Sequence, residues 1–284
     1  MHSGSSLVTS TWLQANITSP TVKIIDATWH LPGGDRDALQ EYAAGHLPGA
    51  VFFELAKVAA KDSPLPHTLP KAEDFAAFVG ALGISSQDTV ILYDDSNVRT
   101  SARLWWMFRA FGHENVAVLD GGLKAWKAAG GMLTTDVVTP APVQYEAELQ
   151  EGFFGDWQDA FDTINDASRQ LVDARGTTRF EGSTPEAKEG LRAGHIPGAV
   201  NIPFMSLYNE DGTMKTPDTL KDIMQEGSVS LDKPLVLSCG SGITACVLAL
   251  ALDQVGKNDI SVYDGSWSEW GMRTDLPIET GKAR

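Results

Sequence analysis

Short apolar runs alternate along the first half of the chain with longer stretches of helical character. The runs of strand length are residues 22–27, 90–94 and 116–120. The stretches of helical character are residues 71–82, 101–111 and 123–129, and each is followed at once by a glycine, Gly83, Gly112 or Gly130. A glycine in that place is typical of a helix end, so the pattern predicts alternating strands and helices.

The second half of the chain repeats the same alternation. Its strand-length runs are residues 170–174, 234–238 and 260–264, and its helical stretches are residues 217–225 and 244–254, the latter stopped by Gly256. Alternation of this kind predicts an α/β fold, in which helices cover both faces of a parallel sheet. A ligand would then bind at the carboxyl ends of the strands.

The two halves are copies of one domain. Ala44-Gly-His-Leu-Pro-Gly-Ala50 matches Ala193-Gly-His-Ile-Pro-Gly-Ala199, and Leu119-Asp-Gly-Gly-Leu-Lys-Ala-Trp126 matches Tyr263-Asp-Gly-Ser-Trp-Ser-Glu-Trp270. Self-similarity at a steady shift indicates tandem repetition of a structural unit. We expect a first domain over residues 1–135, a linker over 136–160 and a second domain over 161–284.

A cysteine loop lies between a strand and a helix of the second copy. The apolar run that ends at Ser238 is followed by Cys239-Gly-Ser-Gly-Ile-Thr244 and then by an apolar helix, with Thr244 as its expected N-cap. Backbone amides in such a loop, together with the positive end of the helix dipole, form an anion-binding bowl that favours a thiolate. The alternative is that Cys239 is a buried apolar residue, as we expect of Cys246.

The first copy lacks this cysteine. Asp94 occupies the position that corresponds to Cys239, and a carboxylate cannot act as a sulfur nucleophile. Only the second loop is therefore equipped for thiol chemistry, which indicates duplication followed by loss of one site. The alternative is that both loops are structural.

Composition and charge narrow the class of ligand. The 284-residue chain has 22 Lys and Arg against 37 Asp and Glu, a formal net charge of −15, so we expect it to repel nucleic acid and anionic membranes. It has no apolar run of about 18 residues, and its first residues lack the pattern of a signal peptide, so we expect none. Two cysteines without a disulfide framework favour a reducing compartment, and we expect the cytoplasm.

Two reactions suit a thiolate among backbone amides. Phosphoryl transfer needs an arginine at the sixth position after the cysteine, where this chain has Ala245. Sulfur transfer needs no arginine at that position. The thiolate takes up a sulfur atom to form a persulfide, the backbone amides stabilise the negative charge of the persulfide, and the sulfur is then passed to an acceptor. That chemistry requires no metal and no organic cofactor.

With these motifs, the whole chain resembles the two-domain rhodanese-type sulfurtransferases. The loop Cys239-Gly-Ser-Gly-Ile-Thr244 is similar to the loop of members that use 3-mercaptopyruvate, whereas members that prefer thiosulfate carry Arg and Lys after the cysteine. Neutral Gly240 and Ser241 suit a donor whose charge is a carboxylate further from the loop.

The resemblance implies a set of residues that bind the sulfur donor. Arg179 matches a residue that binds the donor carboxylate. Lys188 occupies the position of a second expected arginine; a lysine keeps the positive charge but lacks the planar guanidinium that can form two parallel hydrogen bonds. The loop residues expected around the donor are Gly240, Gly242, Ile243 and Thr244. We interpret Arg175 as structural, paired with a nearby carboxylate.

The resemblance also implies a proton relay of a serine, a histidine and an acid. Ser241 matches the serine and His67 the histidine, although an exposed loop histidine is the alternative for His67. The acidic position falls at Ala56, so the third member stays open, with Glu54 and Asp62 nearby. We interpret His46 and His195 as structural, because they occur in both copies.

The leading hypothesis is an enzyme in which Cys239 takes sulfur from 3-mercaptopyruvate and releases pyruvate. The acceptor would be a thiol such as reduced thioredoxin, or cyanide. Two alternatives stay open: a thiosulfate:cyanide sulfurtransferase, and a non-catalytic binding module of the same fold. We expect a small-molecule donor, a monomer, and no nucleic-acid or membrane partner.

Overall fold

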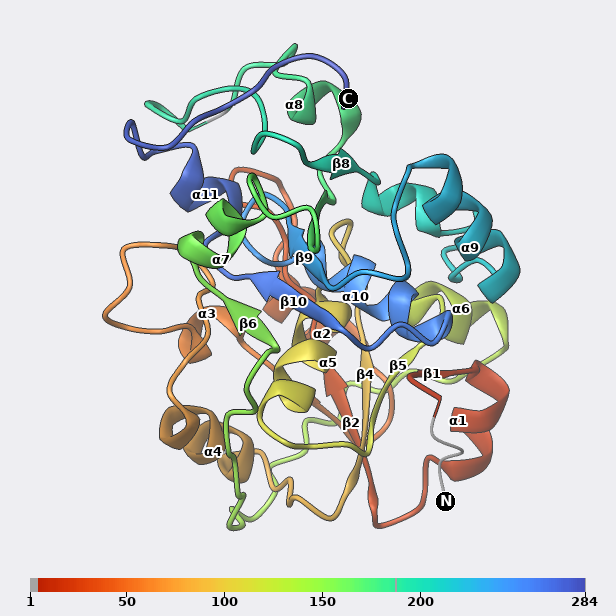
Figure 1. The fold of residues 1–284 in the computed structure, drawn as a ribbon. Helices are drawn as coiled ribbons and strands as arrows, with labels where there is room; N and C mark the ends of the chain where they lie inside the picture. Colours follow the sequence, from red (N-terminus) through yellow and green to blue (C-terminus); the bar gives the residue numbers. More distant parts are fainter. Residues whose placement is uncertain (1–4, 187, 284) are drawn as a thin grey trace. The chain divides into compact units, whose positions relative to one another are not determined.

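The chain folds into two compact units in a computed structural model that describes residues 5–186 and 188–283 (Figure 1). The first unit runs to Lys61 and also contains Leu69–Gln150 and Glu210–Met214. The second unit contains Asp62–Thr68, Glu151–Asn209 and the chain from Lys215 onward. The domain limits inferred from the sequence stay a prediction.

Each unit contains one five-stranded sheet in which every neighbouring pair of strands is parallel. The first sheet has the order β1-β5-β4-β2-β3, with β1 Leu7–Val8, β2 Val22–Asp26, β3 Ala50–Phe52, β4 Thr89–Tyr93 and β5 Val116–Leu119. The second has the order β6-β10-β9-β7-β8, with β6 Phe154–Gly155, β7 Gln170–Asp173, β8 Val200–Asn201, β9 Leu235–Ser238 and β10 Ile260–Tyr263. The two orders correspond strand for strand, so the sequence repeat is a structural repeat.

Helices connect the strands in both units. Those of the first half are α1 Ser10–Asn16, α2 Ala38–Ala44, α3 Leu55–Val58, α4 Ala72–Ala81, α5 Thr100–Ala110 and α6 Gly122–Ala128. Those of the second half are α7 Trp157–Asp162, α8 Thr177–Phe180, the 3₁₀ helix η1 Phe204–Leu207, α9 Pro217–Glu226, α10 Ala245–Gln254 and α11 Ser266–Trp270.

Alternate residues of a strand point to opposite faces of a sheet, and helices cover both faces of each sheet. On one face of the first sheet, Ile91 and Tyr93 of β4 pack in a cluster with Leu13 of α1 and Trp126 of α6. Helix α5 packs against β4 and β5 as well, and its side chains are buried almost throughout. The second unit repeats this arrangement, with α11 in one apolar cluster and α10 against β9 and β10. The predicted α/β fold is confirmed.

The six strands and five helices that the sequence predicted lie within one or two residues of their predicted bounds. The four glycine stops take the left-handed backbone conformation that ends a helix, with φ of 70°, 83°, 73° and 81° at Gly83, Gly112, Gly130 and Gly256. The linker predicted over residues 136–160 contains β6, which pairs with β10, and the start of α7 at Trp157. A strand of two residues is too short to produce a sequence period.

The two units exchange short segments: each contains one segment from the half of the chain that otherwise forms the other unit. Asp62–Thr68, between β3 and α4, is part of the second unit, and Glu210–Met214, at the matching place between β8 and α9, is part of the first. The Nζ atom of Lys124 donates to the Glu210 carbonyl at 2.8 Å, and the Met214 amide donates to a carboxylate oxygen of Asp120 at 2.7 Å. This exchange places His67 in the unit that contains Cys239.

Asp94 fills the first loop with its own carboxylate. The side chain is buried and accepts hydrogen bonds from the amides of Ser96, at 2.9 Å, and Ser101, at 2.7 Å. Burial raises the pKa of Asp94, and these two hydrogen bonds offset part of that effect. In the first copy, therefore, two backbone amides bind a carboxyl group of the chain itself instead of an external ligand.

We predict that Asp94→Ala destabilises the protein, because it leaves two buried amides without an acceptor. The free energy of unfolding should fall by about 2 kcal/mol, measured by urea denaturation. The control is Asp95→Ala, which removes the exposed neighbouring carboxylate that pairs with Arg36 at 2.7 Å and should change stability by less than about 1 kcal/mol. Equal effects of the two variants would contradict the buried-anion role of Asp94.

Candidate active site

The candidate site lies where the strand order of the second sheet reverses. From the centre of the sheet, β7 leads outward to β8 while its neighbour β9 leads the other way to β10. Such a switch point opens a crevice at the carboxyl ends of parallel strands. The register pairs Asp173 with Ser238, so the loops after β7 and β9 begin side by side. Cys239 is the first residue after β9.

The loop of Cys239 is held from one side by the first turn of α11. The carbonyl oxygen of Cys239 accepts from the Trp267 amide at 3.0 Å, and that of Gly240 accepts from the amide and the hydroxyl of Ser268 at 2.8 and 2.7 Å. In a trans peptide the C=O and the following N–H point in opposite directions. The amides of Gly240 and Ser241 are therefore directed away from α11.

These loop amides are available to an anion. Within residues 188–283, the amides of Gly240, Ser241 and Thr244 donate no hydrogen bond to the chain. The Cys239 side chain beside them is buried, with 1% of the residue exposed. A buried thiol next to unused backbone donors is the arrangement that stabilises a thiolate or a terminal persulfide sulfur.

Ser266 anchors the backbone of Cys239, and the sequence analysis did not single it out. Its hydroxyl accepts from the Cys239 amide at 3.1 Å and donates to the Tyr263 carbonyl at 2.8 Å. Its φ of 48° is a left-handed conformation that is costly for a residue with a side chain. The first copy has Gly122 at the matching position, with φ of 56°. The signal available in the sequence was the replacement of Gly122 of the first copy by Ser266 in the copy that contains Cys239.

The start of α10 is close to the prediction. Thr244 occupies the predicted N-cap position, and its hydroxyl makes no capping hydrogen bond. The apolar character of the helix, which is buried from Ala245 to Leu252, accounts for its stability without a side-chain cap. Cys246 is fully buried and its Sγ donates to the Gly242 carbonyl at 3.2 Å, which confirms it as a core residue.

Arg175 is structural, as the sequence predicted. Its guanidinium is buried and forms a bidentate pair with Asp173, with distances of 2.7 to 3.1 Å, and it donates to the Gly194 carbonyl at 2.8 Å. The group also lies 4.3 Å from the centre of the Trp267 ring. Arg175 thus ties the end of β7 to α11.

Arg179 lies beside the cysteine loop. A Cβ atom placed on Gly240 would be 3.6 Å from Nη1 and 3.7 Å from Nη2 of Arg179. The Arg179 side chain is 43% exposed and pairs with Glu186, whose Oε2 accepts from Nη2 at 2.5 Å and from Nε at 3.2 Å. The structure therefore places a cation next to the loop, and it adds Glu186, which the sequence analysis missed.

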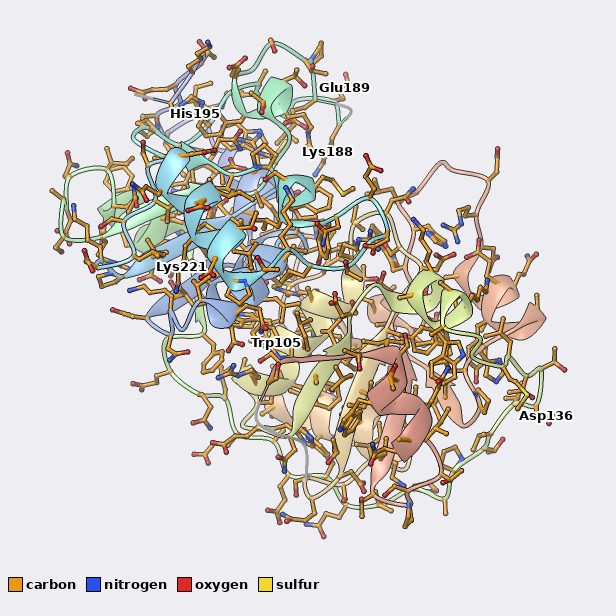
Figure 2. The ribbon with its side chains drawn as sticks, turned by 90° about the vertical axis from the view of Figure 1, so that its right-hand side faces the viewer. Trp105, Asp136, Lys188, Glu189, His195 and Lys221 are labelled. Atoms are coloured by element: carbon orange, nitrogen blue, oxygen red, sulfur yellow. The ribbon has the colours of Figure 1, made fainter. Side chains whose placement is uncertain are left out.

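Lys188 is an exposed residue for which the described structure gives no contact with the loop. It is exposed on the surface segment that follows α8, next to Glu189 (Figure 2). Among the described residues, its ammonium group makes no hydrogen bond or ion pair. Its predicted role at the donor carboxylate stays a prediction.

Ser241 and His67 belong to the same unit, and their relay stays a prediction. Ser241 is half-buried in the cysteine loop, and His67 is half-buried with φ of 60° in the exchanged segment Asp62–Thr68. Of the acidic candidates, Glu54 pairs with Lys57 at 2.7 Å in the first unit.

The repeated histidines are structural, as predicted. His46 is buried, donates from Nδ1 to the Tyr42 carbonyl at 2.7 Å and stacks on the Tyr42 ring. His195 is buried in the same manner, with Nδ1 donating to the Phe180 carbonyl at 2.9 Å and its ring stacked on Phe180. Each histidine joins its Gly-His-x-Pro-Gly turn to a nearby helix.

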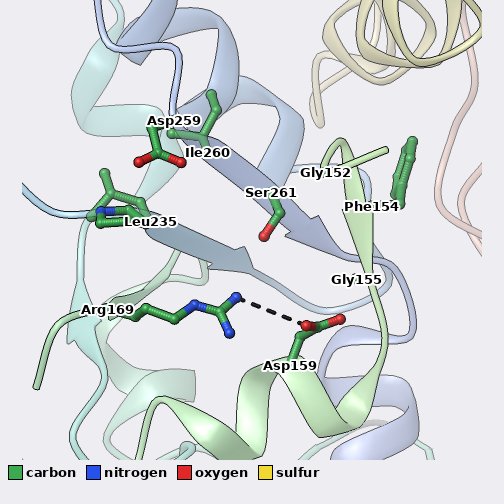
Figure 3. Close-up of a pocket in the computed structure, with 10 residues that line it drawn as sticks. Gly152, Phe154, Gly155, Asp159, Arg169, Leu235, Asp259, Ile260 and Ser261 are labelled. Carbon is green, nitrogen blue, oxygen red and sulfur yellow. Dashed lines mark ion pairs between the residues drawn. The ribbon is translucent and has the colours of Figure 1, made fainter. Parts of the chain in front are cut away.

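A cavity of about 330 Å³ lies at the other end of the second sheet (Figure 3). It is formed where β9 and β10 begin, at Leu235 and Ile260, and Arg169 and Asp159 project into it with 3.9 Å between Nη2 and Oδ1. Cys239 follows the carboxyl end of β9, so this cavity is not the site of thiol chemistry.

Comparison with known proteins agrees with this geometry. The model of the rhodanese-like domain matches residues 9–129 and 156–273. The mitochondrial thiosulfate/3-mercaptopyruvate sulfurtransferase 1 of Arabidopsis thaliana is 40% identical over 96% of this chain and 78% of its own length. The human 3-mercaptopyruvate sulfurtransferase is 41% identical over 94% of this chain and 92% of its own length.

A solved structure shares the fold over nearly the whole chain. The crystal structure of SseA from Escherichia coli, described as a 3-mercaptopyruvate sulfotransferase with the rhodanese fold, has a TM-score of 0.85 and 39% identity. The match covers 93% of this chain and 100% of that chain. The chain therefore belongs to the rhodanese family, and it is an enzyme of sulfur transfer with two rhodanese-like domains. No helix among residues 5–186 and 188–283 is long and apolar enough to span a membrane.

We predict that Ser266→Ala lowers the free energy of unfolding by about 1–3 kcal/mol, because it leaves the Cys239 amide and the Tyr263 carbonyl unpaired. Ser266→Gly loses the same hydroxyl but relieves the left-handed backbone, so it should be about 1 kcal/mol more stable than Ser266→Ala. Urea denaturation of the two variants measures this. An alanine variant as stable as the wild-type protein would refute the anchoring role.

Proposed function

We propose that the enzyme takes sulfur from 3-mercaptopyruvate, carries it as a persulfide on Cys239 and releases pyruvate. The observation that carries this proposal is the buried Cys239 beside unused loop amides, with Arg179 next to Gly240. The backbone amides can stabilise the negative charge of a terminal sulfur, and the Arg179 guanidinium can form charge-assisted hydrogen bonds with the carboxylate of the donor.

The reaction has two steps at Cys239. In the first, the thiolate attacks the sulfur of 3-mercaptopyruvate, an S–S bond forms and the C–S bond breaks. Its electron pair leaves with the carbon as the enolate of pyruvate, which then takes up a proton. In the second step, an acceptor thiolate attacks the outer sulfur, the S–S bond breaks and Cys239 returns to the thiolate.

The proton for the enolate needs a donor near the loop. We assign this task to Ser241 and His67, which fit the relay implied by the family resemblance. Their membership of one structural unit supports the assignment. An acceptor of the thiol class, such as reduced thioredoxin, or cyanide would complete the cycle. We also propose a monomer that works in the cytoplasm.

Thiosulfate is the second candidate donor, because one relative at 40% identity is named for both donors. Thiosulfate brings a dianion close to the loop and favours cations there. The residues after Cys239 are the neutral Gly240 and Ser241, which favours a donor with a single, more distant carboxylate. A non-catalytic module is set aside, since the relatives over nearly the full length are enzymes.

We predict that Cys239→Ser abolishes pyruvate release from 3-mercaptopyruvate, because serine cannot carry a persulfide sulfur. Cys246→Ser is the matched control, since this thiol is buried in α10 and has no part in the reaction. It should keep kcat within about threefold, at some loss of stability. Turnover by Cys239→Ser, or equal loss in both variants, would contradict the assignment.

We also predict that Arg179→Ala raises the KM for 3-mercaptopyruvate much more than Lys188→Ala does. Loss of a charge-assisted hydrogen bond corresponds to about tenfold or more in KM, whereas an exposed lysine contributes little. Steady-state kinetics with a thiol acceptor measures both. Equal effects, or none from Arg179→Ala, would remove Arg179 from the carboxylate site.

A further inference from the structure

Glu186 lies between two arginines of the candidate site, although it belongs to a polar surface segment of the sequence. Its Oε1 accepts from Nη1 of Arg175 at 3.2 Å, and its Oε2 accepts from Nη2 of Arg179 at 2.5 Å. Only 2% of the Glu186 side chain is exposed, against 43% for Arg179. One carboxylate thus joins the buried, structural arginine to the partly exposed one beside the cysteine loop.

The contact leaves both N–H groups of Nη1 and the second N–H group of Nη2 of Arg179 for a ligand. Glu186 accepts from Nε and from one N–H group of Nη2, and within the described part of the chain no acceptor binds Nη1. Nη1 is also the guanidinium nitrogen nearest to the position of a Gly240 Cβ. Since Arg175 is itself fixed by Asp173, Glu186 holds the Arg179 fork at a defined place relative to the loop.

The same contact cancels the charge of the site. Asp173, Arg175, Glu186 and Arg179 form one connected chain of ion pairs with two negative and two positive groups. Arg179 therefore offers a directed hydrogen bond without a net excess of positive charge. A monocarboxylate needs little more than that bond, whereas a dianion gains twice as much from every uncompensated positive charge.

We infer that Glu186 is a positioning residue that sets the preference of the enzyme for a monocarboxylate sulfur donor over a dianionic one. It does so by fixing Arg179 in place and by neutralising its charge. This inference rests on the proposed function, because it assigns Arg179 to the carboxylate of the donor.

The test is the Glu186→Gln variant with two donors, 3-mercaptopyruvate and thiosulfate. Glutamine keeps the shape of the side chain, removes one negative charge and weakens the hold on Arg179. The KM for 3-mercaptopyruvate should rise about tenfold, with kcat changed by less than about threefold. The kcat/KM for thiosulfate should stay level or rise, so the ratio of the two kcat/KM values should fall at least about tenfold. A structural role alone would lower both alike.

Two further variants separate position from charge. Glu186→Asp keeps the charge but is one methylene too short to hold both arginines, so the KM for 3-mercaptopyruvate should rise with no gain for thiosulfate. Glu189→Gln removes a carboxylate from an exposed position of the same segment and should leave the ratio unchanged. A shift in Glu189→Gln equal to that in Glu186→Gln would show a general charge effect and overturn the inference.

The remaining outcomes are also decisive. Parallel losses with both donors, or unfolded protein for both Glu186 variants, would show a structural residue and overturn the inference. A wild-type enzyme that takes sulfur from neither donor would overturn the proposed function itself. A wild-type preference for 3-mercaptopyruvate that persists in Glu186→Gln would overturn only the role of Glu186.

Discussion

The hydrogen bonds between α11 and the loop of Cys239 are the constraint on which the candidate site depends. The first turn of α11 binds the carbonyls of Cys239 and Gly240, and Ser266 binds the Cys239 amide. Because the carbonyls are occupied on that side, the next amides of the loop remain for an anion on the other. A left-handed serine at the start of α11 is the strained feature that makes this possible. Strain of this kind persists only where the surrounding structure fixes it, and here the Ser266 hydroxyl is bound to the Cys239 amide and the Tyr263 carbonyl.

The duplicated fold carries two different loops on one scaffold, one that begins with Asp94 and one that begins with Cys239. Both copies end a central strand in a loop that precedes a buried helix. In both, an amide of a later helix, Leu123 of α6 or Trp267 of α11, donates to the carbonyl of the first loop residue. In the first copy, Asp94 supplies the anion and Gly122 takes the left-handed position. In the second, Cys239 and Ser266 replace them. Two differences therefore distinguish the loops: Asp94 against Cys239, and Gly122 against Ser266. The first loop binds its own carboxyl group, whereas the amides of the second remain available to a ligand.

The sequence was sufficient for the fold, and it pointed to the cysteine loop as the candidate site. Strand and helix periods, glycine stops and the internal repeat predict the architecture, because each is a local signal. The cysteine loop and Arg179 followed from motifs and resemblance. The sequence could not predict Glu186, because a glutamate in a polar segment looks like a surface residue until tertiary structure buries it between two arginines. For the same reason β6 was missed: a two-residue strand depends entirely on its partner β10.

Mass spectrometry of the Cys239 peptide after brief exposure of the reduced, folded protein to 3-mercaptopyruvate, without an acceptor, tests sulfur transfer through Cys239 most directly. We predict the gain of one sulfur atom on that peptide, its loss when a thiol acceptor is added, and no gain on the Cys246 side chain. A peptide that stays unmodified while pyruvate is released would contradict a persulfide on Cys239 as the carrier of sulfur.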